Sequence, residues 1–113
     1  MKTELRQGEQ VIKEGSANLQ RNIETVGGKL YLTNQRLIFE AHKFNVQRGV
    51  TEVELSNIQA LHPCWTRQWG LFPIFPNSLA VYTKHGEEYR FVLFGRSAWV
   101  VAIEVHRKAQ RHA

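Results

Sequence analysis

The chain has 113 residues, the size of a single domain, and 42% hydrophobic and 22% charged residues, an ordinary globular composition. Fifteen Lys and Arg residues against ten Glu residues give a net charge of +5. Because no Asp is present, calcium loops, aspartic dyads and magnesium–carboxylate sites are disfavoured. The one cysteine cannot form an internal disulfide, which favours a reducing, cytoplasmic setting; no apolar run reaches the ~18–20 residues of a membrane span, and no secretory signal is expected at the start.

Short stretches in which apolar and polar residues alternate, typical of β-strands, dominate the chain before residue 95. They predict strands over residues 9–20, 28–33, 36–40, 51–55, 58–62, 79–84 and 87–94. The short steps at Asn34-Gln35 and His85-Gly86 each predict a β-hairpin, because Asn and Gly tolerate the backbone angles of tight turns. Gly15 is expected to form a bulge or bend in the first strand. Residues 21–27, 44–49 and 62–77 are expected to be connections.

The pattern changes to a helical period at the C-terminal end. Apolar residues recur at spacings of three and four from Ser97 onward, which predicts an amphipathic helix of about four turns. The stripe expected to face the core comprises Ala98, Val101, Ala102, Val105 and Ala109, widened by Trp99 and Ile103. The chain is therefore expected to be mainly β, about seven antiparallel strands with one C-terminal helix that plugs the open end of a curved sheet.

Three stretches resemble the signature of the GRAM family. The sequence GGKLYLTNQRLIF, residues 27–39, is similar to that family's glycine-led hairpin, roughly G-x-L-y-L-T-N-x-R-L-x-F. Gly8-Glu9-Gln10-Val11 and residues 53–58 resemble its opening strand and a later strand–turn step. The resemblance covers about residues 8–109, and it implies a pleckstrin-homology-like (PH-like) split barrel in a single domain, residues 1–113. It also implies a link to membranes, with anionic lipid binding in some members.

The stretch from His62 to Asn77 is the anomaly in the sequence, because connections are usually polar. It contains four aromatic residues, all three prolines and no acidic residue. One interpretation is a surface that inserts into a membrane interface or docks a partner, since Trp and Phe bury large areas. The other is that this segment folds back over the mouth of the barrel or forms an additional strand.

Candidate lipid- or partner-binding residues follow from this stretch and from basic residues near predicted turns. They are Trp65, Arg67, Trp69, Phe72, Phe75, Lys29, Lys43 and Arg48. Basic side chains near an anionic membrane contribute about 1 kcal/mol each, whereas dispersed ones only keep a small protein in solution. Arg36, within the hairpin signature, is expected either to pair with a Glu or to pack its stem on the sheet.

Other chemistry has weak support in the sequence. No helix-turn-helix, RNA-binding or zinc-finger pattern appears, so nucleic acid is a disfavoured partner. His62 and Cys64 form one i,i+2 pair without further ligands, and Cys64 is expected to be a small buried residue. We therefore expect no cofactor, no metal and no catalysis. The sequence favours a binding module that associates peripherally with anionic lipid or a membrane-linked complex. The alternative is protein–protein association through residues 62–77, most simply a homodimer.

Overall fold

The computed structural model describes residues 1–21, 24–45, 48–68 and 72–111. Seven strands precede one helix, in the order β1 (Val11–Arg21), β2 (Glu24–Thr33), β3 (Arg36–Asn45), β4 (Arg48–Glu54), β5 (Ile58–Gln68), β6 (Phe72–Thr83), β7 (Glu88–Leu93) and α1 (Arg96–Arg111). A single 3₁₀ turn, η1 (Leu55–Asn57), joins β4 to β5. The prediction of a mainly β fold with seven strands and a C-terminal helix is confirmed.

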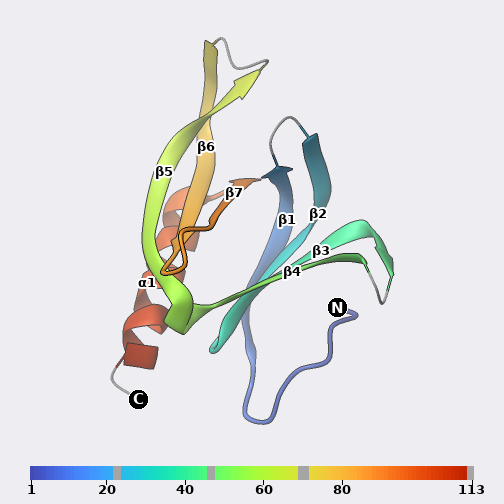
Figure 1. The fold of residues 1–113 in the computed structure, drawn as a ribbon, viewed down its shortest axis with the longest axis vertical. Coiled ribbons are helices and arrows are strands. Elements are labelled where there is room, and N and C mark those ends of the chain that lie inside the picture. Colours follow the sequence, from blue (N-terminus) through green and yellow to red (C-terminus); the bar gives the residue numbers. More distant parts are fainter. Residues whose placement is uncertain (22–23, 46–47, 69–71, 112–113) are drawn as a thin grey trace.

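All seven strands form one antiparallel sheet in the order β4-β3-β2-β1-β7-β6-β5. The two edge strands, β4 and β5, follow each other along the chain through η1, so the sheet curls back on itself as a split barrel. Helix α1 packs against η1, β5 and β6, and Figure 1 shows it alongside the β5–β6 hairpin. The core between sheet and helix consists of apolar side chains such as Leu19, Phe39 and Phe91.

The predicted hairpin at residues 28–40 is confirmed, and its turn has a specific cause. The Thr33 hydroxyl accepts hydrogen bonds from the backbone N–H groups of Gln35 and Arg36, at 3.0 and 2.9 Å, which closes the turn. Leu30 pairs with Phe39 and both are buried. Gly28 is required in β2, because a side-chain carbon there would lie 2.2 Å from the carbonyl oxygen of Glu40.

The strands are longer than the alternating pattern predicts. The connections predicted at residues 21–27 and 44–49 are largely wrong, and at residues 62–77 the structure shows the alternative of additional strand. β1 reaches Arg21 and β2 begins at Glu24, where residues 21–27 were expected to be a loop. β3 and β4 take up most of residues 44–49, and β5 and β6 take up most of residues 62–77. The physical reason is that a neighbouring strand supplies hydrogen-bond partners whatever the local pattern, so polar and glycine-rich stretches also pair.

The predicted bulge at Gly15 is also wrong. Gly15 pairs regularly with Leu30, and the register shift in β1 lies between Val11 and Lys13. A side-chain carbon at position 15 would lie 3.6 Å from Cζ2 of Trp99. Gly15 therefore faces the indole ring of α1, where its lack of a side chain leaves room for a large neighbour.

Helix α1 buries only part of the predicted stripe: the burial of Trp99 and Ile103 is confirmed, and that of Val101 and Val105 is wrong. Trp99 and Ile103 are 3% and 0% exposed, whereas Val101 and Val105, expected to be in the core, are 63% and 57% exposed. Burial favours the larger side chains, since the gain grows with apolar area. The buried face also contains Arg107, whose two terminal nitrogens donate to Glu104 and to the Gln59 carbonyl, while its Nε is buried without a partner among the described residues.

Candidate binding surface

The β5–β6 hairpin extends beyond the rest of the sheet as a two-stranded ribbon. The β6–β7 ladder begins at Ser78, which pairs with Val92, so the described residues 72–77 of β6 pair only with β5. Figure 1 shows both strands rising past the neighbouring strands. We call residues 65–76 the aromatic arm. Its sequence contains Trp65, Trp69, Phe72, Phe75 and one charged residue, Arg67.

Helix α1 anchors the foot of the aromatic arm. Nη1 of Arg96, the first residue of α1, donates to the carbonyl oxygen of Cys64 at 2.7 Å and to that of Ser78 at 3.3 Å. Cys64 and Ser78 face each other as the register pair just before the arm. The arginine thus joins the start of the helix to both strands at the point where the arm begins. This contact could not be predicted from the sequence, because Arg96 lies more than 15 residues from each partner along the chain.

The structure places the predicted site residues in three regions. Trp65, Arg67, Phe72 and Phe75 lie on the backbone of the aromatic arm; their side chains, and all of Trp69, are outside the described part of the structure. Lys43 lies near the end of β3 and Arg48 begins β4. In Figure 1 the end of β3 and the start of β4 lie away from the strands of the arm. Lys29 lies within β2, so the arm and the predicted basic residues are spread along the sheet.

Lys29 and Lys43, the two lysines among the predicted site residues, differ in their surroundings. Nζ of Lys29 lies 3.2 Å from a carboxylate oxygen of Glu14 and 5.6 Å from the centre of the Tyr31 ring. The hydrogen bond to Glu14 raises the pKa of Lys29 above its ordinary value. Lys43 is exposed and borders a hollow of about 240 Å³ between β1, β2, β3 and β4. Of the two, Lys43 is better placed to meet an anionic ligand, since Glu14 partly neutralises Lys29.

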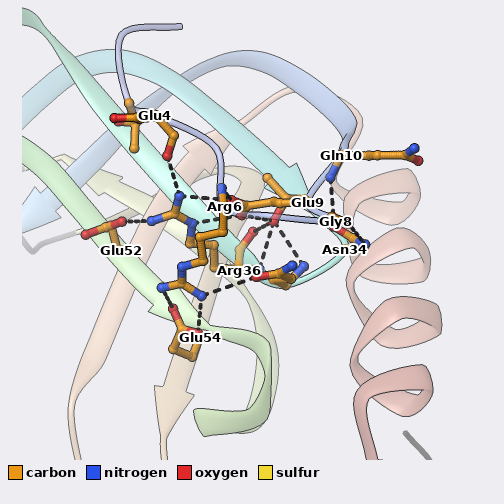
Figure 2. Close-up of polar contacts among 12 residues, drawn as sticks. Glu4, Arg6, Gly8, Glu9, Gln10, Asn34, Arg36, Glu52 and Glu54 are labelled. Atoms are coloured by element: carbon orange, nitrogen blue, oxygen red, sulfur yellow. Dashed lines mark hydrogen bonds and ion pairs between the residues drawn. The ribbon is translucent and has the colours of Figure 1, made fainter.

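A buried ion-pair network lies away from the arm and joins the N-terminal segment to β3 and β4 (Figure 2). Nε of Arg36 donates to Glu9 at 2.8 Å, and the side chains of the two residues are 5% and 0% exposed. Arg36 also donates to Glu52 and, through Nη2, to the Glu4 carbonyl at 3.0 Å. The prediction that Arg36 pairs with a Glu is confirmed. Each hydrogen-bonding atom of the guanidinium is used to hold residues 4–9 against β3 and β4.

Glu9 is ionised by its hydrogen bonds in spite of its burial. Burial alone would raise the pKa of this carboxyl, but donors from Arg36, the Arg6 backbone and the Thr33 hydroxyl outweigh it and lower the pKa from 4.5 to about 2. Asn34 fastens the same segment, because its side chain accepts from Gln10 N–H at 2.9 Å and donates to the Gly8 carbonyl at 3.0 Å. The network therefore positions the chain and leaves little capacity for a ligand.

The family model named GRAM domain matches residues 1–110 of the chain. The chain belongs to the GRAM domain family. This confirms the resemblance drawn from residues 8–11, 27–39 and 53–58. A search of curated proteins gave no match.

Two solved structures resemble this GRAM domain in fold. The "Vps36 N-terminal PH domain" aligns with a TM-score of 0.75 and 17% identity, covering 97% of this chain and 87% of that one. The "C-terminal domain of an unknown protein from Leishmania infantum" aligns with a TM-score of 0.69 and 15% identity, covering 89% and 86%. At such identities the likeness concerns the fold, and it confirms the PH-like architecture. GRAM and PH-like domains are in general modules that bind lipids or proteins.

The geometry assigns a structural task to the residues that carry the GRAM resemblance. Glu9 of the opening Gly-Glu step and Thr33, Asn34 and Arg36 of the hairpin are the residues that hydrogen-bond to one another or to the N-terminal segment. In this GRAM domain, residues of the motif whose resemblance implied a link to membranes close the β2–β3 turn and hold the N-terminal segment in place.

The groups considered for metal or nucleophilic chemistry are not assembled into a site. Cys64 is half-buried, in contrast to its predicted burial in the core, and His62 is exposed with its ring centre 6.5 Å from that of Tyr82. Within the described residues, no group of three His, Cys or Glu side chains is placed to hold a metal ion. Among the same residues, no helix has the length and apolar character needed to cross a bilayer.

Proposed function

We propose that this GRAM domain is a non-catalytic binding module that associates peripherally with anionic membranes through the aromatic arm, on the cytoplasmic side. The observation that carries the proposal is the composition of the arm together with its position. A ribbon of two strands is marginally stable by itself, and this one lies past the last pairing with β7. With four aromatic residues, one arginine and no acid, it suits the boundary between headgroups and acyl chains.

Charge supports the same proposal. The net charge of +5 attracts the domain to an anionic surface, and Arg67 places one cation on the arm itself. Exposed charges are screened over ~10 Å at 0.1 M salt and over ~3 Å at 1 M. We therefore expect binding to weaken as the salt concentration rises, while the apolar contribution of the arm remains.

Co-sedimentation with vesicles tests the proposal. We expect the domain to bind phosphatidylcholine vesicles that contain phosphatidylserine and to bind pure phosphatidylcholine much more weakly. The double substitution Trp69→Ser with Phe72→Ser is expected to weaken binding at least tenfold. The control is Phe94→Ser, since Phe94 is an exposed aromatic residue outside the arm. Binding that ignores phosphatidylserine, or that survives the double substitution, would contradict the proposal.

Homodimerisation through the same arm is the second candidate. It is favoured by the position of β5 at the edge of the sheet, because an edge strand offers unpaired backbone groups to a second copy. Arg96 and Arg107 already bind carbonyl groups of Cys64 and Gln59, so β5 is engaged by the helix at these two positions before the arm begins. Light scattering separates the candidates. A monomer at high concentration excludes the dimer, and a dimer that Phe72→Asp dissociates supports it.

A further inference from the structure

A pocket of about 400 Å³ lies where the aromatic arm leaves the sheet. β1, β2, β3, β6 and the end of β7 all contribute to its wall, so it exists only in the folded domain. Its lining includes the apolar residues Val92 and Phe94 and the polar residues Asn18 and His42. Ala17 and Leu93 also line it, but they are buried and belong to the core. This size and this combination of an apolar wall with a few polar groups are typical of sites that hold a specific ligand.

The described lining carries no fixed charge. None of the nine residues that the structure describes around the pocket is Lys, Arg or Glu. A phosphate or carboxylate group would enter this space without a fixed counter-charge, at a large desolvation cost. A second hollow, of about 340 Å³, adjoins the pocket and shares His42 with it. Lys43 borders that hollow but is not among the described residues that line the pocket itself. Complementarity therefore points to an uncharged ligand.

The exposure of the Phe94 ring has no structural explanation within the described part of the chain. It is 84% exposed, the largest exposed fraction among the big hydrophobic residues that the structure describes. It directly follows β7, and its neighbour Gly95 has a φ of +66°, which turns the chain toward α1. An exposed aromatic ring beside an apolar pocket is a surface on which another ring can pack.

The polar part of the pocket is arranged around a glycine. A side-chain carbon at Gly27 would lie 3.1 Å from Oδ1 of Asn18 and 3.3 Å from Cδ2 of His42. The amide and the imidazole therefore approach each other over a position that has no side chain. Both side chains are exposed, and between them they can accept a hydrogen bond from a single N–H or O–H group.

We propose that this pocket binds the indole or phenol side chain of a protein partner, a Trp or Tyr that packs against Phe94 and hydrogen-bonds to Asn18 or His42. Trp and Tyr combine a large apolar ring with one polar atom, which matches a pocket with an apolar wall and a polar rim. They are also the side chains that most often dominate the binding energy of interfaces. The described residues that line the pocket lie outside the aromatic arm, so substitutions at Phe94 and in the arm can be tested separately.

Titration of the ¹⁵N-labelled domain with N-acetyl-tryptophanamide, followed by NMR, tests the proposal. We expect saturable shifts of the Asn18, Gly28 and His42 signals. N-acetyl-leucinamide and inorganic phosphate are expected to bind at least tenfold more weakly. Phe94→Ala should weaken binding of the tryptophan probe about tenfold, whereas Val101→Ala, an exposed apolar residue on α1, serves as the matched control without effect.

Three outcomes would overturn the proposal. The first is the absence of saturable shifts at these residues. The second is a response to phosphate equal to that of the tryptophan probe, which would identify an anion site. The third is a shift of the same signals with protein concentration alone, which would show that a second copy occupies the pocket. Since Phe94→Ser is also the control of the vesicle assay, loss of probe binding with intact vesicle binding separates this proposal from membrane association.

Discussion

Arg36 and Glu9 show how two residues with opposite charges can be buried in so small a domain. Both side chains are almost completely inaccessible, yet each carboxylate oxygen and each of the Nε and Nη2 atoms has a partner. Taking both charges out of water is costly, and the surrounding hydrogen bonds offset that cost only while the set is complete. The pair is therefore a point at which a single substitution has a large effect.

Removing one member of this pair is expected to destabilise the domain strongly. Arg36→Met keeps much of the side-chain volume but leaves Glu9 buried without its cation, at an expected cost of about 3–5 kcal/mol in the free energy of unfolding. Urea denaturation measures the loss. Arg6→Met is the matched control, because Arg6 and Glu54 form an ion pair in which both side chains are more than 40% exposed. Its expected cost is below about 1 kcal/mol. Equal losses for both would contradict the structure.

The pKa of Glu9 predicts the acid response of the domain. The folded pKa, about 2, lies below the ordinary value of 4.5, so the folded state favours the ionised carboxylate. The resulting stability is fully present above pH 4.5 and is lost as the pH falls toward 2, about 3 kcal/mol in all. Glu40 acts in the same direction: burial raises its pKa, but hydrogen bonds from Thr3 and Lys2 lower it overall. Unfolding measured from pH 7 to pH 2 should show this loss, and Glu9→Gln should flatten the curve.

At the scale of elements, helix α1 shows where hydrophobic periodicity reaches its limit. The apolar residues of α1 lie on two opposite faces, and the predicted stripe combined Val101 and Val105 on one with Trp99 and Ile103 on the other. The structure buries the face with Trp99 and Ile103, where Arg96, Arg107 and Gln110 also donate to backbone carbonyls. Hydrogen bonds from charged and polar side chains to distant strands leave no trace in the helix sequence, so the choice of face could not be derived from it.

The buried face of α1 yields a paired prediction. Trp99→Ala removes a ring that is 3% exposed and is expected to lower the free energy of unfolding by about 3–5 kcal/mol. Val101→Ala, on the opposite face, is expected to change it by less than about 0.5 kcal/mol. Chemical denaturation of both variants checks the assignment. A large loss for Val101→Ala with a small one for Trp99→Ala would contradict this assignment of the buried face.

At the scale of the whole molecule, the sequence was sufficient for the architecture and insufficient for the sites. Seven strands and a helix in the right order could be predicted from such patterns as Val53 and Leu55, which alternate with glutamates and do lie in the core. The single-domain boundaries stay a prediction. The aromatic arm was visible as an unusual composition, but its strands were not, since Pro63 and register shifts after Cys64 interrupt the pattern. The pocket was not predictable, because Asn18, His42 and Phe94 come from distant parts of the chain.

The arm is expected to be separable from the rest of the fold. Cys64 and Ser78 are a direct register pair, so residues 65–77 can be replaced by the two-residue turn Asn-Gly, which suits a tight hairpin. The shortened domain retains every pairing of β6 with β7 and the contact of Arg96 with the Cys64 and Ser78 carbonyls. We expect circular dichroism and thermal unfolding close to those of the full chain, with vesicle binding lost. A shortened domain that fails to fold would show that the arm belongs to the core; one that folds and still binds vesicles would move the membrane contact to the β3–β4 end, where Lys43 lies.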